Sequence, residues 1–297
     1  MFKISLTILA LAGAGAFFIR FTHSPKAPVT AALNYLDYSR EIDSLGAKSA
    51  YAKFQKETAL NPSSEQRHRL AHEFGLALYE KSGLDGIGVC GQEFDFGCYH
   101  SFLSAAILDH GLTIAGRLDE ICNQQFGADD VVCQHGIGHG LVGHVGYKPP
   151  DLLQVLQICK TLSSKGPLAG CKSGAFMEYN QQTLHALSVP GTPAGRPLDS
   201  AGPHAPCRQA PEEFIPACYS EQPHWWKAVF NWDFKKIGEL CGEAGTEKLV
   251  EICVRSLGYS LKSNYDDDTV LITKACQSMP DKQKKFMCLD AAGLKFP

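Results

Sequence analysis

The stretch LDEICNQQFGADDVVCQHGIGHGLVGH, residues 118–144, decides the fold because it has the pattern of two helices joined by a turn. The first helix is expected to end at Gly127, and the aspartates that follow can cap the second. Cys122 would then lie near the end of the first helix and Cys133 near the start of the second. A disulfide between them would staple the two helices across their turn and contribute roughly 3 kcal/mol by restricting the unfolded chain.

The same spacing of cysteines recurs along the chain. The twelve cysteines form six consecutive pairs, and the second members are 35, 38, 47, 35 and 35 residues apart. The expected disulfides join Cys90 with Cys98, Cys122 with Cys133, Cys159 with Cys171, Cys207 with Cys218, Cys241 with Cys253, and Cys276 with Cys288. A period near 35 is the length of one helix–turn–helix unit. The sequence therefore predicts an all-α fold of about seven α-hairpin repeats, stapled by local disulfides, in a superhelix or an α/α ring.

In layout these repeats resemble the cysteine-stapled tetratricopeptide-like repeats of exported bacterial proteins. Cys90 and Cys98 have the short spacing of that arrangement, whereas the other pairs are wider. The resemblance concerns the layout alone and carries no function to this chain.

The N-terminus has the features of an export segment. An apolar run within residues 1–20 follows a basic residue, and residues 14–16 (Ala-Gly-Ala) offer a small-residue cleavage site. The apolar run continues past that site, so residues 1–20 are either a cleaved signal peptide or an uncleaved membrane anchor. Residues 21–30 are expected to be a linker, and the repeat domain is expected to span residues 31–297.

The cysteines also indicate the compartment. Zinc and iron–sulfur sites usually need close Cys-x-x-Cys pairs, and the sequence contains none. Disulfides are therefore favoured, which places the protein in an oxidising, extracytoplasmic compartment, either periplasmic or secreted. The net charge is −3 and no basic stripe is present, so a nucleic-acid partner is not expected.

Prolines concentrate in residues 188–216, and this stretch accounts for the long step of 47 residues. It is predicted to be an irregular insertion between repeats. Long loops in compact proteins are often functional or flexible, so two interpretations remain open. The insertion is either a flexible surface loop or a flap over a site, with His204 on it.

Histidines recur at fixed positions after the second cysteine of each pair. With that cysteine counted as zero, positions +2 and +6 lie one helical turn apart and share a face. A repeat without cysteines precedes the stapled ones, with Gln66 at position zero, and follows the same rule. Equivalent positions of three consecutive repeats are thus occupied by His68, His72, His100, His135 and His139. We call these five histidines the histidine column, because equivalent positions of stacked repeats line up on one face. The column predicts a site for a transition metal ion, Zn, Cu or Fe; a proton-handling or anion-binding cluster is the alternative.

Further residues complete the predicted site. Glu73 and Glu178 are the nearest carboxylates and are predicted as general bases or additional ligands. In the later repeats, positions +2 and +6 no longer hold pairs of histidines. Three residues at these positions, His224, Arg255 and Tyr259, are predicted to contact a substrate. The glycines between and beside the last two histidines of the column either allow close helix packing or leave space beside a ligand.

The sequence favours an extracytoplasmic helical-repeat protein with a histidine-rich metal site. Such a site is compatible with a metal-dependent enzyme. One alternative is a non-catalytic scaffold that binds a peptide or a partner protein on its concave face. Another is a metal carrier or sensor. The sequence does not specify the reaction, or whether the partner is a small molecule or a protein.

Overall fold

The computed structural model describes residues 35–61, 63–127, 131–163, 166–184, 195–198 and 200–295. These residues form thirteen α-helices and no strand, so the predicted all-α class is confirmed for the described part of the chain. The predicted export segment and linker, residues 1–30, lie outside it. None of the described helices is both long and apolar enough to cross a membrane.

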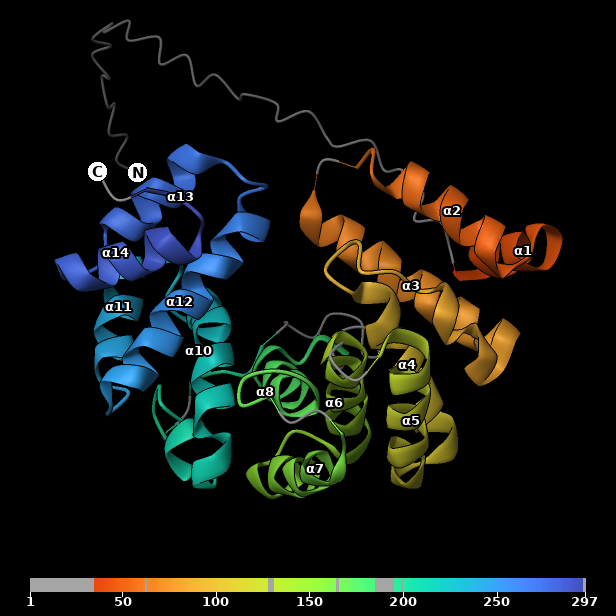
Figure 1. The fold of residues 1–297 in the computed structure, drawn as a ribbon, viewed down its shortest axis with the longest axis horizontal. Helices are drawn as coiled ribbons and strands as arrows, with labels where there is room; N and C mark the ends of the chain where they lie inside the picture. The colour runs from red at the N-terminus through yellow and green to blue at the C-terminus, as the bar shows by residue number, and fades with distance from the viewer. Residues whose placement is uncertain are drawn as a thin grey trace, which may run out of the picture. The chain divides into compact units, whose positions relative to one another are not determined.

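Seven helices follow one another in space as they do in sequence, and we call them the column helices because each carries position +2 of its repeat. Each packs against the next one, as Figure 1 shows for the path from α3 to α14. They are α3 (Ser64–Ser82), α4 (Gly97–His110), α6 (Val131–Val145), α8 (Cys171–Gln181), α10 (Ile215–Val229), α12 (Glu247–Asn264) and α14 (Lys282–Ala291).

The remaining helices precede or connect the column helices. They are α1 (Tyr35–Leu45), α2 (Ala47–Thr58), α5 (Ala115–Phe126), α7 (Pro149–Thr161), α11 (Phe234–Gly242) and α13 (Thr269–Gln277). Short 3₁₀ segments cover Gly83–Val89, Leu112–Ile114, Cys207–Gln209 and Glu212–Phe214. Local sequence sets the helix ends: Ser63 caps α3 by accepting a hydrogen bond from the backbone N–H of Gln66, and α3 ends at Gly83, which has a positive φ.

All six predicted cysteine pairs are disulfides. The bonds join Cys90 to Cys98, Cys122 to Cys133, Cys159 to Cys171, Cys207 to Cys218, Cys241 to Cys253, and Cys276 to Cys288. In each pair the second cysteine lies in a column helix, and the first cysteine lies in the helical segment before it or just after that segment. The disulfides therefore fix where the six column helices after α3 start relative to the preceding segment.

The last two staples show that this arrangement continues to the end of the array. Cys241 of α11 bonds to Cys253 of α12, and Cys276 of α13 bonds to Cys288 of α14. Cys253 and Cys288 are both completely buried. The predicted neighbour pairing is therefore confirmed in the repeats without column histidines as well as in those with them.

Glycine lets the column helices approach closely. A Cβ atom on Gly138 of α6 would lie 2.0 Å from the carbonyl oxygen of Cys171 in α8. A Cβ atom on Gly174 of α8 would lie 1.9 Å from the carbonyl oxygen of His135 in α6. Neither distance is sterically possible, so the contact between α6 and α8 requires glycine on both helices. This supports close helix packing as one reason for the glycines around the histidines.

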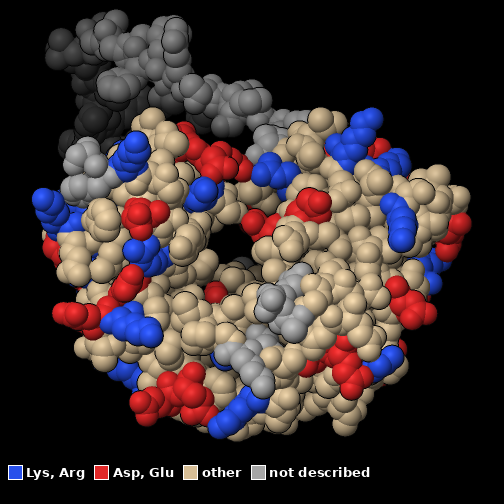
Figure 2. Space-filling model, in the orientation of Figure 1, with Lys and Arg blue, Asp and Glu red and all other residues tan. Residues whose placement is uncertain are grey.

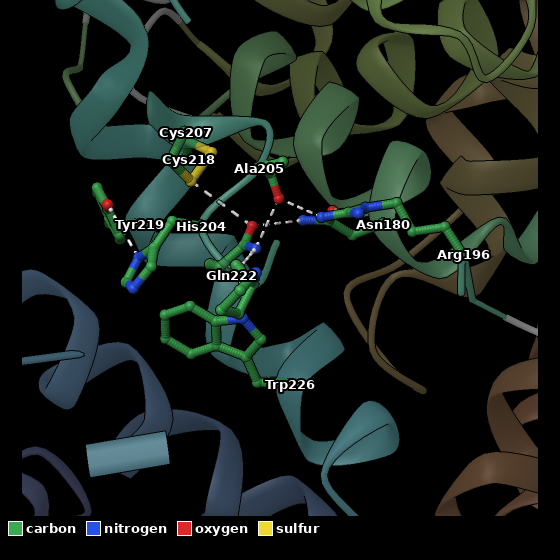
Figure 3. Close-up of a disulfide and its surroundings, with 10 residues drawn as sticks. Asn180, Arg196, His204, Ala205, Cys207, Cys218, Tyr219, Gln222 and Trp226 are labelled. Carbon is green, nitrogen blue, oxygen red and sulfur yellow. Dashed lines mark hydrogen bonds between the residues drawn. A yellow bond between two sulfur atoms is a disulfide. The ribbon is translucent and has the colours of Figure 1, made fainter. Parts of the chain in front are cut away.

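The described part of the proline-rich insertion is anchored beside the Cys207–Cys218 disulfide (Figure 3). Arg196 donates from Nε to Asn180 Oδ1 at 2.9 Å, and its guanidinium lies 3.6 Å from the ring centroid of Trp225. Gln222 of α10 donates to the carbonyl oxygen of Ala205 at 2.9 Å. These buried contacts hold Arg196 and Ala205, and with them this part of the insertion, against α8 and α10.

His204 does not lie over the histidine column. Its ring is buried against α10, with Nδ1 3.2 Å from the hydroxyl oxygen of Tyr219 and Nε2 3.1 Å from Glu243. It is not among the residues that line the cavity bordered by the column helices. The interpretation of this stretch as a flap that carries His204 over the site is therefore not supported by its described part.

The first column helix contacts the turn that follows α12. Arg67 of α3 forms an ion pair with Asp266 at 2.8 Å, and Ser263 of α12 donates to Asp95 at 2.9 Å. The column helices from α3 to α12 border a cavity of about 1070 Å³. Figure 2 shows a hollow among the described helices, with charged side chains of both signs around it.

Candidate metal centre

The cavity brings together most of the residues that the sequence singles out. Four histidines of the column line it from α3, α4 and α6, and three later column residues line it from α10 and α12. These residues are His68, His100, His135, His139, His224, Arg255 and Tyr259. The fifth histidine of the column, His72, is buried and contacts His68.

The pair on α3 consists of His68 and His72, whose Nε2 atoms are 3.0 Å apart. His68 Nδ1 lies 2.8 Å from the carbonyl oxygen of Phe94. Since a carbonyl only accepts, this nitrogen carries the ring hydrogen, and Nε2 of the neutral ring carries the lone pair. His72 Nδ1 is 2.7 Å from the hydroxyl oxygen of Ser101 on α4. The neighbouring segments therefore hold both rings through Nδ1 and turn both Nε2 atoms toward each other.

The pair on α6 repeats this arrangement with His135 and His139, whose Nε2 atoms are also 3.0 Å apart. His139 Nδ1 donates to the Glu178 carboxylate at 3.0 Å. His135 Nδ1 is 3.0 Å from Ser173 Oγ, and Ser173 gives its own hydrogen to Glu221 at 2.6 Å. Both Nδ1 atoms are thus donors, and the two Nε2 atoms present lone pairs to each other.

Burial favours the neutral form of four of the five column histidines. Desolvation lowers the pKa of His68 and holds the pKa values of His72, His100 and His135 well below the ordinary range, and neighbouring imidazoles add repulsion. A proton shared between two Nε2 atoms is disfavoured for the same reason. Neutral imidazole is the form that binds metal ions.

His100 of α4 lies between the two pairs. Both of its ring nitrogens are buried and, within the described residues, neither has a hydrogen-bond partner. The ligand nitrogens fall into two groups of three, with all atoms of a group within 4.8 Å of one another. One group is His68, His72 and His100; the other is His100, His135 and His139. Each triad could hold a metal ion.

Glu178 contacts His139 on the side of the ring that carries Nδ1. Its carboxylate is fully buried and accepts hydrogen bonds from Tyr147 at 2.6 Å, from the Leu184 backbone at 2.9 Å and from Thr183, besides the one from His139. A carboxylate with four donors around it orients the imidazole that it contacts. It does not line the cavity, and nothing in these contacts supports its predicted role as a base.

Glu73 is not brought to the histidines. It pairs with Arg69 one turn earlier on α3, it is half-buried, and burial raises the pKa of its carboxyl group. It is absent from the cavity wall. Its predicted catalytic role has no contact in the structure to support it.

The far wall of the cavity has a different chemistry. Arg255 of α12 pairs with Glu251 at 2.8 Å and with Asp290 of α14 at 2.7 Å, so its guanidinium is already engaged. Tyr259, one turn later, is 61% exposed and open to a ligand. His224 of α10 is half-buried, and burial lowers its pKa to about 3.

Two buried charged residues of α10 were missed by the sequence reasoning. Burial raises the pKa of Glu221 to about 7 and lowers that of Lys227 to about 7. Lys227 donates to Ser260 at 3.0 Å, and its ammonium lies 5.5 Å from the Trp232 ring. Neither residue occupies a +2 or +6 position, so the repeat gave no signal for them. Ser173 does occupy position +2, and its place in the column could have marked it as a partner of His135.

No protein-family model matches the chain, and neither a curated protein nor a solved structure shows significant similarity to it. The chemistry of the site is therefore the basis for a functional conclusion.

Proposed function

We propose that the protein is an extracytoplasmic metalloprotein whose five column histidines hold a transition-metal site at the wall of the cavity. The observation that carries this proposal is the contact between His135 and His139, whose Nε2 atoms face each other at 3.0 Å. Both rings use the Nδ1 hydrogen for a partner on α8. Neutral rings would then oppose two lone pairs, and a cation between the nitrogens removes this conflict.

A metal ion suits this position better than a proton does. Burial penalises an imidazolium, whereas a metal ion binds the neutral ring. Two bonds of about 2.0–2.1 Å to one ion place the two nitrogens roughly 3 Å apart, which is the spacing of both histidine pairs. The carbonyl, hydroxyl and carboxylate partners on Nδ1 are the outer contacts that metal-binding histidines usually have. All-imidazole ligation fits Zn, Cu or Fe.

The location follows from the disulfides. Six disulfides suggest an oxidising compartment, since the cytosol keeps thiols reduced. The proposal takes the repeats as a closed α/α ring of about seven hairpins. The Arg67–Asp266 ion pair supports closure because it joins α3 to the turn after α12.

Metal-dependent catalysis on a small molecule is the activity that this arrangement would serve. The cavity is large enough for such a molecule and reaches both the histidines and the far wall. There, His224 and Tyr259 would contact the substrate. A bound metal ion would supply an activated water for hydrolysis or, if redox-active, an electron acceptor. Glu178 would hold the orientation of His139.

The test is the metal content of the full chain, exported to an oxidising compartment and purified without an affinity tag or chelator. Mass spectrometry should find near-stoichiometric Zn, Cu or Fe. The variant His135→Ala/His139→Ala should lose the metal that this pair holds while it keeps its helical circular dichroism. The matched control is His224→Ala, which changes the histidine at position +6 of a later repeat and should keep the metal. Metal-free wild-type protein that also takes up none of the three ions would overturn the proposal.

A second function has one observation in its favour. Trp232 and Tyr259 line the cavity and are 41% and 61% exposed. Exposed aromatic side chains at a concave surface are typical of protein and peptide recognition. A metal-free protein would favour this scaffold function.

A further inference from the structure

His100 occupies the middle of the histidine cluster. Its ring centroid lies 5.4 Å from that of His68 and 5.3 Å from that of His72. On the other side the distances are 5.5 Å to His135 and 4.3 Å to His139. The residue belongs to α4, which packs between α3 and α6. Both histidine pairs are therefore within reach of this one ring.

His100 also differs from the other four histidines in its hydrogen bonding. Each of the others has a hydrogen-bond partner for Nδ1 on a neighbouring segment. Both nitrogens of His100 are buried without a partner among the residues that the structure describes. A buried polar atom without a partner lowers the stability of the folded state. A ring that keeps two such atoms has two positions available for ligands.

We propose that His100 bridges two metal ions, one shared with His68 and His72 and the other with His135 and His139. This inference rests on the proposed metal site and specifies its nuclearity. The ligand nitrogens form two triads that have only His100 in common, instead of one group of five. Each metal ion would have three imidazole ligands, which leaves a position for water or a small substrate from the cavity.

Both nitrogens of one ring can bind metal only after the ring loses its N–H hydrogen. A neutral imidazole has one lone pair, so the first ion binds there. The second ion displaces the ring proton, which passes to solvent, and an imidazolate remains between the ions. The step forms one metal–nitrogen bond, breaks one N–H bond and transfers no electron.

The bridge is tested with Cu(II) alone as the probe, added to the metal-free full chain. We expect two Cu(II) ions per chain and an integrated electron paramagnetic resonance signal well below that of two independent ions, because an imidazolate bridge couples their spins. The variant His100→Phe keeps a ring of similar shape without nitrogen donors, and each copper ion that it retains should give full signal. The matched control, His110→Ala, removes an exposed histidine from the end of the same helix and should behave as the wild type does.

The outcomes separate this inference from the function on which it rests. One Cu(II) per chain, or two with full signal, would overturn the bridge and leave the metal site standing. No bound Cu(II), together with no uptake of Zn or Fe, would overturn both. The wild-type measurement decides by itself if His100→Phe does not fold.

Discussion

The two ends of the column use equivalent positions in opposite ways. At position +2, the early repeats place His68, His100 and His135 beside one another; His100 is buried, and the other two rings are half-buried at the cavity. The same position in the last two repeats holds Arg255 and Asp290, which form an ion pair at 2.7 Å. In both regions, residues at position +2 of adjacent repeats contact each other. The scaffold thus sets which positions meet, and residue identity sets what the contact can do.

The two kinds of contact differ in whether the residues satisfy each other's charge or hydrogen-bonding groups. Arg255 and Asp290 satisfy each other's charge, and the pair is partly exposed, so it contributes little stability. The early rings instead keep lone pairs at His135, His139 and His100 without a hydrogen to face them. A repeat position that is structural at one end of the array is therefore available for ligand chemistry at the other.

The largest effect should come from the packing that both regions share. Gly138 and Gly258 are both at position +5, and a Cβ atom there would lie 2.0 Å and 2.4 Å from a backbone oxygen of the next column helix. Gly138→Ala and Gly258→Ala should each lower the free energy of unfolding by about 3 kcal/mol, because the helices cannot move apart without cost. Chemical denaturation measures this.

Gly116→Ala is the matched control for this comparison. Its Cβ atom would meet nothing within 4 Å inside α5, so the substitution should be neutral or stabilise by roughly 0.5–1 kcal/mol. If Gly138→Ala strongly lowered the free energy of unfolding and Gly258→Ala did not, close packing of the column helices would not be a common property of the array.

A smaller effect is expected from the buried charge of the later region. Burial lowers the pKa of Lys227 to about 7 from 10.5, so the unfolded chain binds more protons than the folded one between these values. Stability of the metal-free protein should rise with pH across this window. Lys227→Met should reduce that slope and raise the free energy of unfolding near pH 7 by on the order of 2 kcal/mol.

Denaturation of the variant and the wild type at several pH values above 7 measures this contribution as a difference, because Lys172, whose pKa burial also lowers, is present in both. Glu221, whose pKa burial raises to about 7, changes stability below that pH and little above it. Lys248→Met removes an exposed lysine of α12 and should leave the slope as it is in the wild type. An unchanged slope in Lys227→Met would show that the lysine is charged in the folded protein across this window.

The smallest effect concerns two serines at position +2. Ser173 accepts from His135 and donates to Glu221. Ser220, at the same position of the next repeat, makes no hydrogen bond to a column histidine within the described part of the chain. Ser173→Ala should weaken metal binding by about 10-fold, because outer contacts orient metal-binding imidazoles. Ser220→Ala should leave the affinity unchanged. Competition with a chromogenic chelator compares the metal affinities of the two variants. Equal affinities would show that Ser173 does not contribute to metal binding.

Much of this arrangement could be predicted from local sequence. The cysteine period predicted the six staples, which join residues only 8 to 12 positions apart, so their pairing needed no long-range information. The helical turn between positions +2 and +6 predicted the pairs His68/His72 and His135/His139. Glu73 and Glu178 were chosen by nearness in sequence, and that criterion does not show which way a side chain points.

The sequence by itself determined the helical repeat, the staples and the column of five histidines, because each depends on periods within one or two helices. Only the tertiary structure decided which nitrogen of each ring is free. The Nδ1 partners of His68, His135 and His139 lie 26 to 39 residues away, on segments that meet the rings only after the helices pack. The central place of His100 and the cavity beside it have the same origin, since both require the column helices to curve past one another.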